Sequence, residues 1–282
     1  MSELGLLIRA HGGFFDVETE KGNTVRCRAR GRLHLENTEP IPGDRVRWEP
    51  DGDYGVVIGI EPRKNVFIRP NMANLEQLIY VASAARPVTD PYLIDTMSVV
   101  AGEADCNFIL CVNKIDLDSG DSLCASYSGC NFPVIRVSAE TGFGIETLRE
   151  TLKGRISAFT GNSGVGKTSL LNLLLPGVDR NVAEISAKRG RGRHTTRLTE
   201  LFPLPDSGYI ADTPGFAALE FNRLSDMEDI ARYFAEFPVG ECRFPDCIHR
   251  AEPDCAVRRA VDEGTVAASR YQSYLRMLQE KN

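Results

Sequence analysis

The stretch GNSGVGKTS, residues 161–169, decides the fold of this chain. It matches the Gly-x4-Gly-Lys-Thr pattern of a Walker A phosphate loop, lies after the apolar run RISAFT (155–160) and opens the helical pattern SLLNLLLP (169–176). A buried strand, a glycine-rich loop and a helix in that order predict a nucleotide-binding α/β domain. A glycine-rich turn arising by chance is the competing interpretation, and the flanking strand and helix disfavour it.

The residue types of this loop predict how it would hold phosphate and metal. Its glycines let backbone N–H groups curve around the phosphates at the positive end of the helix. We expect Lys167 to reach the β- and γ-phosphates and the Thr168 hydroxyl to ligate Mg²⁺, so both residues also belong to the expected catalytic set. The expected phosphate-binding residues are Gly161, Asn162, Ser163, Gly164, Val165, Gly166, Lys167, Thr168 and Ser169.

A second motif, Asn-Lys-Ile-Asp at residues 113–116, predicts that the base is guanine. The Asp116 carboxylate would accept both the N1–H and the exocyclic N2–H of guanine, whereas adenine has no matching pair of donors. Asn113 would support the base or the neighbouring loops, and the stem of Lys114 would lie along the base. At the next predicted strand end, Ser138-Ala139 is placed to give a backbone N–H to the guanine oxygen.

A third motif, Asp-Thr-Pro-Gly at residues 212–215, follows the strand pattern SGYIA (207–211). We expect Asp212 to hold Mg²⁺ through water and Gly215 to donate its N–H to the γ-phosphate. The basic, glycine-rich segment KRGRGRHTTR (188–197) precedes this motif, and Thr195 or Thr196 would close onto Mg²⁺. A solvated basic surface loop is the alternative interpretation of that segment.

The segment ECRFPDCIHRAEPDC, residues 241–255, predicts a metal site. Three thiolates and one imidazole suit a tetrahedral zinc ion, and the expected ligands are Cys242, Cys247, His249 and Cys255. So short and irregular a segment has no core of its own, so the metal would supply the folding free energy. Four protein ligands leave no open position, which favours a structural role. Buried cysteines beside a surface histidine are the alternative.

Residues 1 to about 65 read as short strands separated by turns, which predicts a small closed β-barrel. An OB-type barrel fits best, although several small barrels give this pattern. In TVRCRARGRL (24–33) four arginines alternate with small or apolar residues and would share one face of a strand. That face, formed by Arg26, Arg28, Arg30 and Arg32, is the expected contact to RNA, and an ordinary exposed charged strand is the competing interpretation.

From about residue 73 the pattern changes to alternating apolar strands and helices, which predicts a parallel sheet covered on both faces. After residue 218 the pattern is helical, and Val266, Tyr271, Tyr274, Leu275 and Leu278 form a stripe that would pack against the neighbouring domain. The predicted domains are therefore a barrel at 1–66, a nucleotide-binding domain at 67–220 and a zinc-binding helical domain at 221–282.

The composition limits where such a protein would work. The formal net charge of -6 excludes a globally basic nucleic-acid binder, so any contact to RNA must come from local patches. No apolar stretch approaches the roughly 20 residues of a membrane-spanning helix, and the first residues do not read as a signal peptide. We therefore expect a cytoplasmic protein with mostly reduced cysteines, no membrane partner and a monomeric state.

The order of these motifs is specific. Asn-Lys-x-Asp, Ser-Ala, Walker A, GRHTT, Asp-Thr-Pro-Gly and then Cys-x4-Cys-x-His-x5-Cys resembles the circularly permuted GTPases of the ribosome small subunit-dependent GTPase A family (RsgA, also YjeQ or YloQ). The resemblance covers essentially the whole chain, and it implies an N-terminal OB fold and a zinc site. It also implies a GTPase that binds the 30S subunit late in its assembly and is stimulated by it. Asp254 departs from the family pattern, where glycine is expected.

Many GTPases place glutamine after the Asp-x-x-Gly motif to orient the attacking water, and this chain has Phe216 there. His194 in the basic segment is the best substitute, and the resemblance supports it. A phosphate or rRNA contact is the alternative role for His194. Slow turnover until a partner orders the segment is expected in either case.

The leading hypothesis is a GTP hydrolase that binds 16S rRNA through the barrel and the zinc domain and acts in late maturation of the 30S subunit. Its cofactors would be Mg²⁺ with GTP and one structural Zn²⁺. A guanine-nucleotide sensor with negligible turnover is the alternative. A GTP-dependent RNA-modifying enzyme is disfavoured, because the sequence offers no second catalytic constellation.

Overall fold

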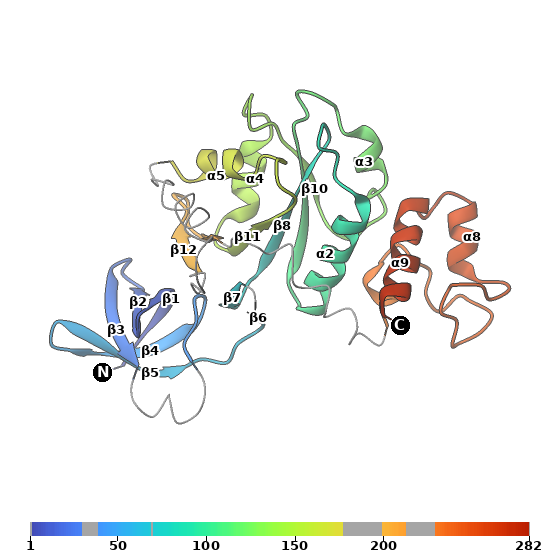
Figure 1. Ribbon diagram of the computed structural model, residues 1–282. Helices are drawn as coiled ribbons and strands as arrows, with labels where there is room; N and C mark the ends of the chain where they lie inside the picture. Colours follow the sequence, from blue (N-terminus) through green and yellow to red (C-terminus); the bar gives the residue numbers. More distant parts are fainter. Residues whose placement is uncertain (1, 30–38, 69, 177–198, 213–228, 282) are drawn as a thin grey trace, which may run out of the picture. The chain divides into compact units, whose positions relative to one another are not determined.

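The computed structural model describes residues 2–29, 39–68, 70–176, 199–212 and 229–281 (Figure 1). Its contacts divide the chain into two compact units. The first is formed by Met1–Glu76, Leu152–Phe159 and Leu174–Phe216, and the second by Gln77–Thr151, Thr160–Leu173 and Ala217–Asn282. Among the described residues, no helix is long and apolar enough to cross a membrane.

The first unit contains a closed five-stranded barrel. Its strands are β1 (Glu3–His11), β2 (Phe14–Thr19), β3 (Thr24–Ala29), β4 (Arg45–Asp51) and β5 (Tyr54–Ile60). They follow the order β1-β2-β3-β5-β4, and a β1–β4 pairing closes the ring. The inward residues Leu7, Phe15, Val17, Cys27, Val46, Trp48 and Val57 form its core. The prediction of an OB-type barrel is confirmed.

The alternation predicted for the third strand is also confirmed where the structure describes it. Cys27 is buried in the barrel, and Arg26 and Arg28 on either side of it are exposed. Arg30 and Arg32 lie outside the described residues. One face of β3 therefore carries arginine and the other carries the core.

The remaining strands of the first unit extend from the barrel. β12 (Glu200–Pro203) pairs antiparallel with β1 and with β13 (Tyr209–Asp212), and β13 pairs in parallel with β11 (Ile156–Thr160). A hairpin of β6 (Val66–Ile68) and β7 (Asn71–Ala73) follows the barrel in sequence. The strand at β12 is not apparent in the sequence pattern.

The second unit contains the parallel sheet of β8 (Gln77–Ser83), β9 (Asn107–Asn113) and β10 (Val134–Arg136). Every residue of β8 is buried, as expected for a strand covered on both faces. The helices are α2 (Pro91–Glu103), α3 (Asp121–Ala125), α4 (Ile145–Leu152) and α5 (Lys167–Leu174). α2 packs against β8 and β9 (Figure 1).

The C-terminal segment also belongs to the second unit. It consists of the 3₁₀ turn η2 (Ala231–Tyr233), α8 (Ala256–Asp262) and α9 (Ala268–Lys281). Residues 231–237 contain only that turn, where the sequence pattern favoured a helix. The predicted stripe on the last helix is confirmed, because Val266 and Tyr274 are buried in a cluster that includes Tyr92 and Val99 of α2.

Arg270 joins the C-terminal segment to α2. Its side chain is 1% exposed, and it donates to Asp95 Oδ1 at 2.8 Å and to Glu236 Oε1 at 2.6 Å. Its guanidinium carbon also lies 4.3 Å from the ring centroid of Phe234. The stripe predicted for this helix does not include Arg270, and nothing in the sequence pattern indicates that this arginine is buried.

Candidate nucleotide site and metal centre

The phosphate loop runs from the end of β11 to the start of α5, in the context that the sequence predicts. Gly161 has φ 131° and Gly166 has φ 95°, and both lie where glycine is favoured. A Cβ atom on Gly161 would stand 2.2 Å from the carbonyl oxygen of Val81, and one on Gly166 would stand 2.2 Å from Asn113 Nδ2. These two glycines are therefore required by close packing as well as by backbone conformation.

Lys167 points into the loop. Its ammonium donates to the carbonyl oxygens of Gly161 and Asn162, each at 2.6 Å. Burial lowers the pKa of this lysine from its ordinary value. A partly desolvated cation within a turn of backbone N–H groups suits a phosphate anion. Thr168 follows at the second position of α5, where a hydroxyl would ligate Mg²⁺.

Asn113 connects the base motif to the phosphate loop. Its Nδ2 donates to the carbonyl oxygen of Val165 at 2.8 Å, across 52 residues of sequence. Its Oδ1 accepts from the backbone N–H of Ala139 at 3.1 Å. Asn113 therefore supports the neighbouring loops, which is one of the two roles expected for it. The Ala139 N–H, which we expected to serve the guanine oxygen, already has this intramolecular acceptor.

Asp116 and Ser138, two further residues expected to lie at the base, are hydrogen-bonded to each other. The Ser138 hydroxyl donates to Asp116 Oδ1 at 2.5 Å, which fixes the carboxylate at the end of the sheet. Lys114 has a positive φ of 66°, and its ammonium donates to the carbonyl oxygen of Arg86 at 3.0 Å. The sequence analysis did not predict this contact of Lys114 with Arg86. The acceptor is a backbone carbonyl, which every residue type has, so no sequence pattern identifies it.

Several expected nucleotide residues cannot be placed. His194, Thr195, Thr196 and Gly215 lie outside the described residues. Asp212 is the last residue of β13, so its backbone is at a strand end as predicted. The roles assigned to these residues stay predictions.

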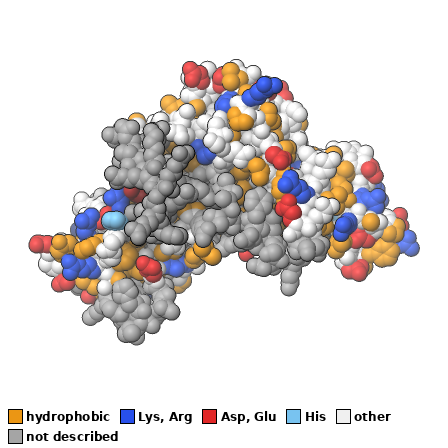
Figure 2. Space-filling view, viewed as in Figure 1, with side chains coloured by type: hydrophobic (Ala, Val, Ile, Leu, Met, Phe, Trp, Pro, Cys, Tyr) orange, Lys and Arg blue, Asp and Glu red, His pale blue; other side chains and the backbone are white. Residues whose placement is uncertain are grey.

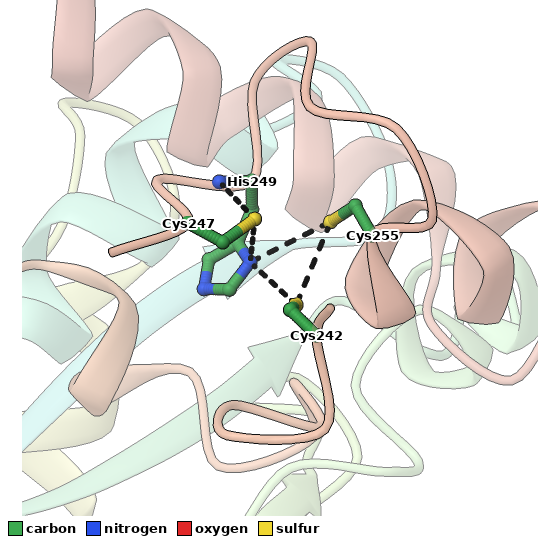
Figure 3. Close-up of side chains that lie close together, drawn as sticks. All are labelled: Cys242, Cys247, His249 and Cys255. Atoms are coloured by element: carbon green, nitrogen blue, oxygen red, sulfur yellow. Dashed lines mark hydrogen bonds between the residues drawn. The ribbon is translucent and has the colours of Figure 1, made fainter. Parts of the chain in front are cut away.

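The four predicted zinc ligands converge on one point (Figure 3). His249 Nδ1 lies 3.4 Å from Cys242 Sγ and 3.5 Å from Cys247 Sγ. It also lies 3.5 Å from Cys255 Sγ, and the Cys242 and Cys255 sulfurs are 3.9 Å apart. A tetrahedral zinc ion with ordinary bond lengths requires sulfur–sulfur separations of about 3.8 Å and sulfur–nitrogen separations of about 3.6 Å. The donor set and its spacing fit zinc.

Neighbouring groups hold these ligands in place. The Glu252 carboxylate accepts backbone N–H groups of Ile248, Arg250 and Ala251 around His249. Burial alone would raise the pKa of Glu252, but these N–H donors lower that pKa to about 2. Asp254 has a left-handed φ of 56°, a conformation that aspartate tolerates better than most residues, so the turn forms here without the glycine that the resemblance led us to expect. Glu252 was missed from the sequence.

Comparison with known families agrees with this arrangement. Residues 60–222 match the RsgA GTPase family and residues 4–58 match the RsgA N-terminal domain. The small ribosomal subunit biogenesis GTPase RsgA of Thermotoga maritima is 41% identical over 284 residues, which cover 98% of this chain and 96% of that protein. Its counterpart from Moorella thermoacetica is 43% identical over 281 residues, with the same two coverages.

Solved structures show the same fold. The crystal structure of YjeQ from Thermotoga maritima matches with a TM-score of 0.85 and 37% identity, over 100% of this chain and 99% of that one. YloQ, a circularly permuted GTPase, matches with a TM-score of 0.84 and 30% identity, over 100% of this chain and 95% of that one. With its barrel, its permuted nucleotide motifs and its Cys/His cluster, the chain belongs to the RsgA GTPase family.

Proposed function

We propose that this protein hydrolyses GTP to GDP and phosphate during late maturation of the 30S ribosomal subunit, and that the subunit stimulates hydrolysis. The hydrogen bond from Asn113 to Val165 carries this proposal, because it joins the guanine motif to the phosphate loop in one nucleotide site. Relatives named as small ribosomal subunit biogenesis GTPases support this setting, and the cytoplasm is the compartment that we propose.

Each residue of the nucleotide site has a separate function in this proposal. Asp116 selects guanine, Lys167 neutralises the phosphates, and Thr168 with Asp212 holds the Mg²⁺ that stabilises charge on the transferred phosphoryl group. His194 positions the attacking water, because Phe216 replaces the usual glutamine. Thr195 or Thr196 completes the metal site when GTP is bound.

The domains at 1–66, 67–220 and 221–282 divide the remaining roles. The barrel and the zinc domain contact 16S rRNA. The central domain, through GTP hydrolysis, determines when the protein, which acts as a monomer, is released from the subunit. Zn²⁺ bound by the Cys/His cluster is structural, since the four ligand atoms within 4.8 Å of one another complete a tetrahedral shell.

The test is GTP hydrolysis with and without purified 30S subunits, with ATP as the control substrate. We expect slow turnover alone, strong stimulation by the subunit and no ATP hydrolysis. The Lys167→Ala variant should lose stimulated hydrolysis, and His194→Ala should lose stimulation while it still binds GTP. Undetectable hydrolysis with subunits, together with tight GTP binding, would replace the proposal by the nucleotide-sensor function.

A further inference from the structure

The outer face of the barrel carries two rows of side chains that cross three strands. Strand pairing places His11 opposite Phe14 and Phe14 opposite Arg28 in the first row. In the second row, Arg9 is opposite Asp16 and Asp16 is opposite Arg26. Because the alternate residues Phe15, Val17 and Cys27 fill the barrel core, both rows point outward.

The first row continues onto β5 through Tyr54. The guanidinium carbon of Arg28 lies 5.0 Å from the ring centroid of Phe14 and 5.1 Å from that of Tyr54. The two rings are 6.2 Å apart, and Tyr54 is 43% exposed. We name Phe14, Arg28 and Tyr54 the aromatic–arginine row. In this row the guanidinium of Arg28 lies against both aromatic rings.

The backbone brings this row together. Tyr54 is followed by Gly55, where a Cβ atom would stand 2.6 Å from Cys27 Sγ. Glycine therefore lets β5 approach β3 closely, as their parallel pairing shows. Tyr54 at the start of β5 is held beside the outward residues of β2 and β3.

The charges of the two rows differ. Asp16 lies 3.9 Å from Arg9 and 3.2 Å from Arg26, and Arg9 also pairs with Glu200. The second row is thus close to electrically balanced. Among the ion pairs of the described residues, none involves Arg28, whereas Arg9 and Arg26 are both paired. Figure 2 shows basic side chains gathered around a histidine on this face, and a small hollow there is lined by Arg9, His11, Phe14, Asp16 and Arg26.

We propose that the aromatic–arginine row binds an unpaired nucleotide of single-stranded RNA. The base stacks on the exposed ring of Tyr54 beside Arg28 and Phe14, and the adjoining phosphate pairs with Arg28. Bases within an A-form duplex are already stacked and offer a protein only phosphate and groove edges, so this row selects unpaired bases. The proposal rests on the proposed function, because it specifies the kind of RNA that the barrel contacts.

An acidic peptide is the other occupant to consider. Its carboxylates would pair with Arg28 but leave the faces of Tyr54 and Phe14 without a partner. A nucleotide would contact both the guanidinium of Arg28 and the two rings. A single nucleotide does not require a broad basic surface, and the second row, whose charges are balanced, does not form one. The charge pattern therefore favours RNA.

The experiment uses the full-length protein and fluorescence anisotropy with a labelled six-nucleotide oligouridylate, a 12-base-pair RNA duplex and a hexaglutamate peptide at one salt concentration. Tyr54→Ala should weaken oligouridylate binding about 10-fold or more, and Tyr54→Phe should stay within about twofold of the parent. Arg28→Gln should weaken it similarly. Duplex binding should change by less than about twofold in the Tyr54 variants.

Arg47→Gln is the matched control, because Arg47 is an exposed arginine of the same barrel on β4, paired with Glu61 at 2.8 Å. It should bind oligouridylate like the parent. Thermal unfolding of each variant checks that the barrel is intact. Three results would each overturn the proposal. The Tyr54→Ala variant could lose affinity equally for oligouridylate and duplex, or it could lose no affinity for oligouridylate. The parent protein could also bind hexaglutamate more tightly than RNA.

Stimulation of GTP hydrolysis by 30S subunits separates this proposal from the function on which it rests. If the parent is not stimulated, the proposed function fails whatever the oligouridylate result. If the parent is stimulated and Tyr54→Ala binds oligouridylate normally, the aromatic–arginine row fails and the proposed function stands.

Discussion

The loops around Asn113 and Asp116, here called the guanine loops, and the Cys/His cluster are both predicted ligand sites, yet they are held together in different ways. In the guanine site the protein satisfies its own groups, since Asn113 bridges Val165 and Ala139, and Ser138 holds Asp116. In the cluster, three thiols and an imidazole face one another around one point. The first is organised by protein hydrogen bonds, and the second has a donor set that could hold a metal ion at its centre.

This difference predicts different consequences when the ligand is removed. Guanine loops tied by direct hydrogen bonds keep their arrangement without nucleotide. The ligand atoms of the three thiols and the imidazole lie within 4.8 Å of one another, and we expect bound zinc to supply most of the free energy that holds them there. We therefore expect the C-terminal segment to depend on bound zinc as well as on the buried ion pairs of Arg270.

Removal of zinc should have the largest effect. Cys255→Ser, or treatment with a chelator, should release the metal and unfold the C-terminal segment, because structural zinc contributes about 10–16 kcal/mol in small zinc modules. Hydrogen exchange should rise across 229–281 and remain unchanged in the barrel. Cys124→Ser, which alters a cysteine outside the cluster, is the control. Unchanged protection of α8 and α9 without zinc would remove the distinction between the two sites.

Loss of Arg270 should come next. Arg270→Met leaves Asp95 and Glu236 as buried carboxylates without their cation, and such changes cost about 3–5 kcal/mol. Denaturant unfolding measures this free energy. Arg276→Met on the same helix should cost about 1 kcal/mol, because the Arg276 side chain is 53% exposed. Similar costs for the two variants would show that burial of this charge cluster is unimportant.

Asp116→Asn should change the base preference. The variant loses charge-assisted acceptance from guanine, and we expect GTP affinity to fall by about 3 kcal/mol, or about 150-fold. Xanthosine triphosphate should bind the variant better than GTP, because an amide N–H can donate to the oxygen at position 2. Calorimetry with both nucleotides checks this, and Asp118→Asn, outside the motif, is the control. Retained GTP preference would mean that another group selects the base.

Glu252→Gln should have the smallest effect. The carboxylate orders three backbone N–H groups around His249, and loss of its charge should lower zinc affinity about 10-fold, within the usual range for groups that support metal ligands. Competition with a colorimetric chelator measures the affinity. Glu263→Gln, at the C-terminal end of α8, is the control. A zinc affinity equal to that of the parent would show that the metal alone orders this turn.

Much of the architecture could be predicted because its signals are local. The Walker A loop follows a buried strand, Asn113–Asp116 ends another strand, and the Cys/His spacing is short enough to close around one ion. Alternation of arginine with Cys27 likewise identifies the outer face of β3. Each of these signals depends on residues that are close together in the sequence.

Other features could not be predicted because they depend on partners distant in sequence. Arg270 is buried between two carboxylates, those of Asp95, 175 residues away, and Glu236, 34 residues away. The strand β12 is stabilised by its pairing with β1 and β13 rather than by its own pattern. Residues 231–233 form a 3₁₀ turn where the sequence pattern favoured a helix, and Phe234 and Phe237 after it pack into the cluster around α9.

The sequence by itself determined the family motifs and the donor groups of each predicted site, since both are set by residue type and short spacing. Tertiary structure decided which loops share a site, which arginine is buried, and that Tyr54 meets Phe14 and Arg28 on one face of the barrel. The physical reason is that hydrogen bonds, ion pairs and ring contacts act over a few ångströms. Only the folded chain brings residues of distant sequence position within that range.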